Sequence, residues 1–415
     1  MKNARLAAFE LVYNVINNSS YSNLSLDSAL KDVSSEDKSF FSALSLGVIE
    51  RRITLDYIVS RFLTSRTKPK VKILLYLGAY QLYFMDKIPS SAAVNETVEL
   101  SKQVGCSYYS GLINALLHKI DENRIDVDSL EDLSVRYSCP SALINMWKKH
   151  YGDDNTLNIL NEINGVPPVF AIPNTLYVDR DELGYELLCD KIENEPYGDV
   201  IKITSPFDLS KSNAFKNGLF HIEDYSSYLC AKALEAKEGE TVFDVCSAPG
   251  GKAFTIAEAM NNRGNLYAFD LHINRVKLIS DGAERLGLTC IKADVNDASV
   301  YNPSLPKADK ILCDVPCSGF GIIRRKPEIR YKELDGIKEL FELQYQILLT
   351  SSKYLKRGGR IVYSTCTLNK KENEKVVKRF IDENGGFKLL SQKTIFPEAD
   401  SGDGFFFSVM ELNDD

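Results

Sequence analysis

The chain has 415 residues, a net charge of −7 at neutral pH, 44% hydrophobic residues and 26% charged residues. This length suits several domains, and the balanced composition excludes a disordered, collagen-like or disulfide-stapled protein. The nine cysteines are odd in number and include no CxxC pair, so neither a disulfide framework nor a four-thiolate zinc site fits. The four histidines form no cluster, so we expect no metal. Free thiols favour a reducing, cytoplasmic compartment.

Residues 1–130 are predicted to form an all-helical domain, because helical spacing of apolar residues dominates and strand-like alternation is scarce. Glu10 and Asn14 interrupt the first apolar run, which therefore predicts an amphipathic helix rather than an export signal. The most apolar run, residues 73–85, is too short for a spanning helix of roughly 20 residues. The expected helices are 3–17, 36–62, 70–84, 90–104 and 108–119.

This helical region is also the basic part of the chain. Its first 125 residues carry 15 Lys and Arg against 12 Asp and Glu, a net charge of +3, which leaves −10 for the remainder. Between residues 51 and 72 only Asp56 opposes the positive charges. Such a cluster is either a solvated helix face or a contact for RNA phosphates. The candidates for phosphate contact are Arg51, Arg52, Arg66 and Lys68.

Residues 131–223 are predicted to hold linker helices and then a small α+β domain. An acidic stretch at 121–133 precedes a helical region at 134–160, in which Trp147 is expected to pack in a core. After the double proline 167–168, strand-like segments replace the purely helical pattern. Strands are expected at 169–178 and 200–204, around a helix near 181–193.

Residues 224–415 are predicted to form a doubly wound, Rossmann-like α/β domain. Strands that are apolar throughout and alternate with helices indicate a parallel sheet covered on both faces. The expected strands are 241–246, 265–270, 289–294, 310–314 and 360–366. The expected helices are 224–236, 252–260, 273–286 and 334–356.

The predicted strands end in polar residues, at the edge where open α/β sheets bind ligands. Asp270, Asp294 and Asp314 end the second, third and fourth strands, where acids accept hydrogen bonds from ribose hydroxyls. The glycines after the first strand permit close backbone approach, although the spacing is not the GxGxxG of nicotinamide sites. Together these residues indicate a nucleoside pocket without a phosphate clamp, which suits S-adenosylmethionine. The turn consists of Cys246, Ser247, Ala248, Pro249, Gly250, Gly251 and Lys252.

Of two further cysteines, Cys317 follows the fourth predicted strand and Cys366 ends the fifth. A thiolate is the best protein nucleophile near neutral pH. Its addition to carbon 6 of a pyrimidine makes carbon 5 enamine-like, so that carbon 5 can attack a sulfonium methyl group. Asp314 is placed to act as an acid near N3. The remaining thiols of the sheet are interpreted as buried structural cysteines: Cys246, Cys290 and Cys313.

A basic segment follows Cys317 closely. It is either a solvated turn or a contact for the phosphates that flank a target base, and we favour the second interpretation. A base cannot react while it is stacked, so we expect an unpaired or flipped cytosine. The segment contains Arg324, Arg325, Lys326 and Arg330.

Three motifs, DVCSAPGGK at 244–252, DVPCSGFG at 314–321 and YSTCT at 363–367, resemble those of the RNA 5-methylcytosine methyltransferases. The helical domain resembles the NusB antitermination factor, so the whole chain is similar to the RsmB (Sun/Fmu) family. This resemblance implies methylation of one cytosine of 16S ribosomal RNA. It implies that Cys366 attacks carbon 6, that Cys317 assists elimination and release, and that residues 246–252 with the three strand-end aspartates surround S-adenosylmethionine.

The sequence is also compatible with other functions. The same chemistry on transfer RNA or large-subunit RNA would use the same residues. A non-catalytic RNA-binding assembly factor is disfavoured, because both motif cysteines and the Gly-Gly turn are present. One departure from the family pattern is Glu223-Asp224, where Gln-Asp is usual.

Overall fold

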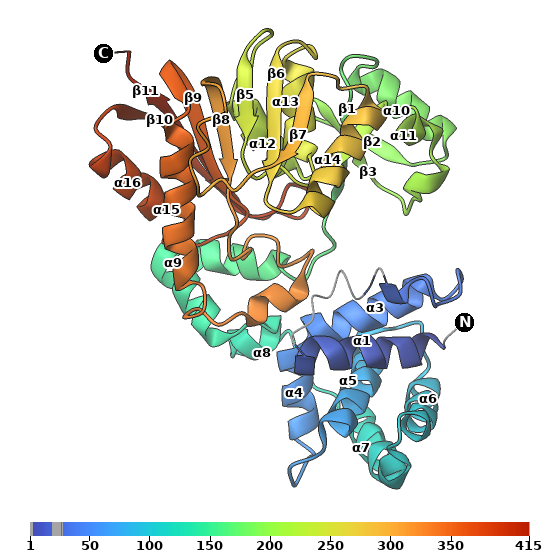
Figure 1. Cartoon of the computed structure of the whole chain (residues 1–415). Helices are drawn as coiled ribbons and strands as arrows, with labels where there is room; N and C mark the ends of the chain where they lie inside the picture. Colours follow the sequence, from blue (N-terminus) through green and yellow to red (C-terminus); the bar gives the residue numbers. More distant parts are fainter. Residues whose placement is uncertain (1–2, 19–25, 27, 415) are drawn as a thin grey trace. The chain divides into compact units, whose positions relative to one another are not determined.

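The computed structural model describes residues 3–18, 26 and 28–414. It divides into two compact units (Figure 1). Unit 1 comprises Met1–Asn164 and Ile323–Lys332, and unit 2 comprises Gly165–Ile322 and Glu333–Asp415. The division of the chain into three domains stays a prediction.

Unit 1 is helical, as predicted. The expected helix 36–62 is two helices, because the backbone at Arg51 leaves the helical region with φ −92° and ψ 17°. In the described part of the chain, no helix has the length and apolarity needed to cross a membrane. The helices are α1 (Ala4–Asn18), α3 (Lys38–Glu50), α4 (Arg52–Ser60), α5 (Pro69–Phe84), α6 (Ser90–Gln103), η1 (Ser107–Tyr109), α7 (Ser110–Glu122), α8 (Leu133–Tyr137), α9 (Ser141–Glu162) and η3 (Pro327–Tyr331).

Helix α5 lies at the centre of the main core of unit 1. Pro69 occupies its first turn, where a missing N–H costs nothing, and the apolar run after it is buried on almost every side. Residues Ile73, Leu74 and Leu75 are each at most 2% exposed. Burying one such side chain contributes about 1.5–3 kcal/mol. Trp147 of α9 is fully buried, as expected for a packing residue.

The segment Ile323–Lys332 is held in unit 1 by Arg330, which is 1% exposed. Its guanidinium donates to the carbonyls of Glu50 (3.1 Å), Ser138 (3.2 Å) and Ile163 (3.0 Å). The guanidinium is enclosed by these carbonyl oxygens and almost inaccessible to solvent, so a phosphate group cannot reach it, although its Nε–H forms no hydrogen bond with a described residue. The prediction that this arginine contacts RNA phosphates is therefore wrong.

Unit 2 begins with an antiparallel sheet of strand order β2-β3-β1-β4. Strands β2 and β4 were not expected from the sequence. Strand β2 (NEPY) has no alternating apolar positions, while β4 (FHIE) alternates but has only four residues. The elements are β1 (Val169–Pro173), α10 (Arg180–Cys189), β2 (Asn194–Tyr197), β3 (Val200–Ile203), η2 (Leu209–Lys211), α11 (Asn213–Lys216) and β4 (Phe220–Glu223).

The second sheet of unit 2 has seven strands in the order β10-β11-β9-β8-β5-β6-β7. The five expected strands are present and parallel, and β11 adds an antiparallel strand between β9 and β10. The elements are α12 (Tyr225–Ala233), β5 (Thr241–Asp244), α13 (Gly251–Ala259), β6 (Asn265–Asp270), α14 (Ile273–Leu286), β7 (Ile291–Val295), β8 (Ala308–Asp314), α15 (Lys338–Ser352), β9 (Leu355–Thr365), α16 (Glu374–Glu383), β10 (Phe387–Ile395) and β11 (Phe405–Leu412).

Helices cover both faces of this sheet (Figure 1). Neighbouring strand residues point to opposite faces, so Val242 joins the core under α12, α13 and α14, while Phe243 joins the core under α15 and α16. In β8, Leu312 likewise joins the first of these cores and Cys313 the second. This two-sided burial explains the continuously apolar strands and confirms the doubly wound, Rossmann-like fold.

Candidate active site

Two of the predicted acidic residues, Asp270 and Asp314, lie at matching register positions at the carboxyl edge of the parallel strands, on either side of β5. Asp244 of β5 is paired in register with Ala268 and Leu312, so Asp270 and Asp314 both lie two residues further toward the edge. Asp314 is paired in turn with Ser364 of β9. The site is therefore built on four adjacent strands, which fix its side chains more firmly than loops would.

The turn after β5 is shaped by Gly250. Its φ of +118° is a conformation that other residues rarely adopt, and a Cβ atom there would lie 2.4 Å from Phe254. Gly251 then begins α13, so the free N–H groups of the first helical turn face the edge of the sheet. Ser247 is tied to β6 by a hydrogen bond from its N–H to the Phe269 carbonyl, at 2.7 Å.

Asp270 is 3% exposed and is held by Arg275, 2.9 Å away. Arg275 also donates to the Ala248 carbonyl at 2.8 Å, so one guanidinium joins the end of β6 to the turn after β5. Asp294 is different. Its side chain is exposed and accepts a hydrogen bond from the N–H of Val295, so it is not joined to this network.

Asp314 is held from two sides. Lys252 of α13 forms an ion pair with it at 2.8 Å, and the Ser364 hydroxyl donates to it at 2.8 Å. Burial alone would lower the pKa of Lys252, but the carboxylates of Asp314 and Glu223 outweigh burial and raise it. Lys252 is thus a fixed cation that links the glycine turn to the end of β8.

The two motif cysteines meet at this edge, with 3.1 Å between the Sγ atoms of Cys317 and Cys366. Cys366 directly follows β9, and Cys317 lies three residues beyond β8, the neighbouring strand. The hydrogen bond with Cys366, together with burial, raises the pKa of Cys317 well above its ordinary value. Cys317 therefore keeps its proton at neutral pH and can donate it to the Cys366 sulfur.

The loop that carries Cys317 is fastened by a buried carboxylate, Glu372. It accepts hydrogen bonds from the Ser318 N–H (2.8 Å), the Ser318 hydroxyl (2.5 Å), Asn369 (2.9 Å) and Gln344 (3.0 Å). The Ser318 hydroxyl also lies 2.7 Å from that of Thr367. The sequence analysis assigned no role to Glu372, because its position in the chain gives no sign that it supports the Cys317 loop.

Replacing Glu372 with alanine is expected to lower kcat by about 100-fold and stability by about 3 kcal/mol, because several buried donors lose their acceptor. The KM for the methyl donor should change little, since the glycine turn does not depend on this carboxylate. Steady-state kinetics and urea unfolding measure both effects. Lys371→Ala, an exposed neighbour, is the control; equal losses in the two variants would show that Glu372 does not position the loop.

A buried ionic cluster behind the glycine turn was not predicted. His221 of β4 lies 3.7 Å from Glu223 and 3.5 Å from Glu258 of α13, and all three are buried. Thr255 donates to Glu223 at 3.0 Å. Burial alone would lower the pKa of His221, but Glu258 and Glu223 outweigh it and raise the pKa to about 9. Glu223 is the position at which this sequence departs from the family pattern. A proton on His221 balances the negative charge of this buried carboxylate.

Replacing His221 with alanine is expected to cost about 3–5 kcal/mol at pH 6, because two buried carboxylates lose their cation. The folded pKa lies above the ordinary value of about 6.5, so the stabilisation is complete below that pH and is lost as pH rises toward 9. Urea unfolding from pH 6 to 9.5 should show the gap to wild type narrowing. A gap that is constant with pH, or equal to that of the exposed-site control His118→Ala, would contradict this account.

The expected phosphate contacts have unequal surroundings. Arg51 is paired with Glu50 at 3.5 Å, and the Arg52 guanidinium lies over the Tyr331 ring at 4.8 Å; both are half-buried. Arg66 and Lys68 are exposed. In the segment 323–332, Arg324 is buried, while Arg325 and Lys326 are half-buried. Exposure thus favours Arg66 and Lys68 as contacts for RNA.

The structural thiols behave as expected from burial. Cys290 and Cys313 are buried, and burial raises their pKa values to about 11 and about 12. Cys246 is partly exposed as a residue, but burial of its thiol raises its pKa strongly. In the described ranges, no group of three or more His, Cys, Asp or Glu side chains is arranged to hold a metal ion.

Comparison with known proteins supplies independent information. The family model "16S rRNA methyltransferase RsmB/F" matches residues 231–411, and the NusB family model matches residues 2–122. The chain is 36% identical to the "Probable ribosomal RNA small subunit methyltransferase B" of Bacillus subtilis, over 97% of both chains. It is 30% identical to the protein of the same description from Synechocystis, over 99% of this chain and 100% of the other. The crystal structure of PH0851 aligns with a TM-score of 0.81 and 26% identity, over 99% of each chain.

Proposed function

This chain belongs to the ribosomal RNA small subunit methyltransferase B family, and we propose that it methylates carbon 5 of one cytosine in 16S ribosomal RNA through a covalent adduct at Cys366. The observation that carries this proposal is the 3.1 Å approach of the Cys317 and Cys366 sulfurs at the edge of the sheet. Methylation of a nitrogen or oxygen needs no thiol, because a lone pair attacks directly. Carbon 5 of cytosine has no lone pair and needs an activating nucleophile.

The edge of the sheet fits S-adenosylmethionine, which when bound supplies an electrophilic methyl group. Asp244 is buried, and neither of its carboxylate oxygens forms a well-aligned hydrogen bond with a described residue. The buried Ser247 hydroxyl likewise forms no such hydrogen bond. Burial raises the pKa of Asp244 to about 7. Such groups suit a ligand or a water molecule that carries hydrogen-bond donors. We infer that the 246–252 turn and Asp270 hold this group, together with Asp294 and Asp314.

In the proposed reaction, the Cys366 thiolate forms a bond to carbon 6 of the cytosine. The electron pair of the 5,6 double bond moves toward carbon 5, which becomes nucleophilic. Asp314, fixed by Lys252 and Ser364, lies beside N3 in this reaction and stabilises the proton that N3 takes from solvent. After carbon 5 is methylated, the bond between Cys366 and carbon 6 breaks, and the proton that carbon 5 loses passes to the Cys317 sulfur, which has given its own proton to Cys366. Cys317 supplies a proton to the departing sulfur, which its raised pKa permits.

Two other readings of the substrate are separated by experiment. Transfer RNA or large-subunit RNA would use the same chemistry, and a silent assembly factor would use none. Labelled S-adenosylmethionine should be incubated with deproteinised, unmodified small-subunit RNA, large-subunit RNA and transfer RNA in parallel, followed by nucleoside analysis. One new 5-methylcytidine on small-subunit RNA alone is the expected result. Label on another RNA alone would reject the substrate, and binding without transfer to any RNA would reject the reaction.

A further inference from the structure

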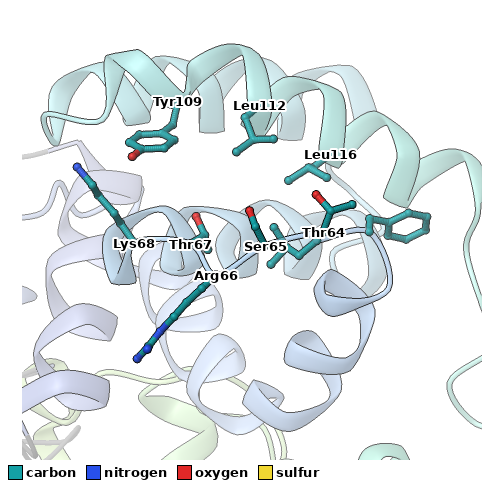
Figure 2. Close-up of a pocket in the computed structure, with 10 residues that line it drawn as sticks. Thr64, Ser65, Arg66, Thr67, Lys68, Tyr109, Leu112 and Leu116 are labelled. Carbon is teal, nitrogen blue, oxygen red and sulfur yellow. The ribbon is translucent and has the colours of Figure 1, made fainter.

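Unit 1 contains a cavity of about 310 Å³ between the loop after α4 and helix α7 (Figure 2). Residues Thr64–Lys68 form one wall, and Tyr109, Leu112 and Leu116 face them from the other side (Figure 2). The volume lies at the lower end of the range for small-ligand sites, about 300–1,000 Å³. The cavity lies outside the methyl-transfer site, and no step of the proposed reaction uses it.

The segments that line this cavity carry positive charges and no negative ones. The stretch 61–72 contains five Lys and Arg and no carboxylate, and the stretch 102–119 contains two lysines and no carboxylate. Lys72 is neutralised by Asp56 at 2.6 Å. Arg66 and Lys68, in contrast, have no ion pair with any residue in the described ranges. Two free cations on a wall without acids attract a phosphate group.

The opposite wall offers an aromatic surface. The Lys68 ammonium lies over the Tyr109 ring, 5.3 Å from its centroid. Tyr108, which is 91% exposed, makes an edge contact with Tyr109 at 5.1 Å. Tyr109 itself is half-buried. Accessible tyrosine rings beside cations are the combination on which unpaired bases stack in single-stranded RNA sites. The hydroxyls of Thr64, Ser65 and Thr67 add donors and acceptors for a base edge or a ribose (Figure 2).

We propose that this cavity binds one unpaired nucleotide of the RNA substrate, away from the cytosine that is methylated. The base stacks on Tyr109 and the apolar side chains Leu112 and Leu116, and its phosphate lies beside Lys68. Arg66 points away from Tyr109 in Figure 2, so it is placed for the phosphate of a neighbouring nucleotide. The proposal rests on the RNA substrate of the proposed function. A peptide ligand is disfavoured, because an acid-free wall with two free cations matches the repeated phosphates of RNA.

The test uses full-length protein and a fluorescent fragment of small-subunit RNA that contains the methylated region. Lys68→Ala and Arg66→Ala should each weaken RNA binding about 5-fold and lower the salt dependence by about one phosphate contact. Tyr109→Ala should weaken binding about 10-fold, and Tyr109→Phe should restore it. Lys87→Ala, an exposed lysine outside the cavity, is the charge-matched control. Urea unfolding of each variant separates lost binding from lost folding.

A methyl-transfer assay on the same variants distinguishes failure of the cavity proposal from failure of the proposed function. With saturating RNA the cavity variants should keep the wild-type kcat, while the KM for RNA rises. Wild-type RNA affinity in folded Lys68→Ala and Tyr109→Ala, with methylation intact, would overturn the cavity proposal alone. Absence of 5-methylcytidine from the wild-type reaction would reject the proposed function, whereas the binding assay would still decide whether the cavity holds RNA.

Discussion

Cys366→Ala protein is expected to bind S-adenosylmethionine normally and to transfer no methyl group. Without the thiolate, carbon 5 of cytosine is not nucleophilic, so the rate should fall by about 10³-fold or more, as nucleophile removal does elsewhere. The cofactor should still bind, because no residue of its proposed site depends on this sulfur. Calorimetry with the cofactor and transfer of labelled methyl to RNA measure the two properties on the same protein.

The matched control is Cys189→Ala, which removes an exposed cysteine far from the sheet edge in sequence. It should retain the wild-type rate. If Cys366→Ala protein transferred methyl groups at a rate close to that of the control, the covalent mechanism would be wrong and a direct transfer would have to be considered.

Cys317→Ala protein is expected to remain covalently joined to its RNA. In the proposed reaction Cys366 still attacks, but the thiol 3.1 Å away is missing, so the departing sulfur receives no proton from it. The adduct should therefore persist and appear as a slowly migrating band in denaturing gels, in an amount approaching one RNA per protein. Turnover should fall by about 100-fold or more.

Two comparisons make this result specific. Cys317→Ala/Cys366→Ala protein should form no band, because no nucleophile remains. Omission of S-adenosylmethionine should decrease the band, because elimination without methyl transfer merely reverses the addition. A Cys317→Ala protein that turns over normally and forms no adduct would remove Cys317 from the mechanism.

The elements that could be predicted from the sequence are those determined by the local spacing of apolar residues. Long apolar strands alternating with helices located the five parallel strands, and residues 273–286 coincide with α14. Strand ends that carry Asp270 and Asp314 are placed at one level by the sheet register. The motif resemblance to RsmB and NusB is confirmed by the family models and relatives.

What the sequence did not predict depends on contacts between distant residues. Arg330 follows three other basic residues and has the pattern of an exposed cation, yet carbonyls from Glu50, Ser138 and Ile163 enclose it. Glu372 holds Ser318, 54 positions away in the chain. These contacts of Arg330 and Glu372 require the folded chain, since no local spacing encodes them. Strand β11 is a different case, because residues 401–404 form a turn signal and a strand-like apolar run follows them, so the sequence contained a signal that the prediction did not use.

The measurement that tests the central claim most directly is to locate the RNA on the protein in the Cys317→Ala complex. The complex would be digested with nuclease and protease, and the modified peptide sequenced by mass spectrometry. The proposed mechanism predicts a single modified peptide in which Cys366 carries a methylated cytidine nucleotide. A nucleotide attached to any other residue, or a complex in which Cys366 is unmodified, would contradict it.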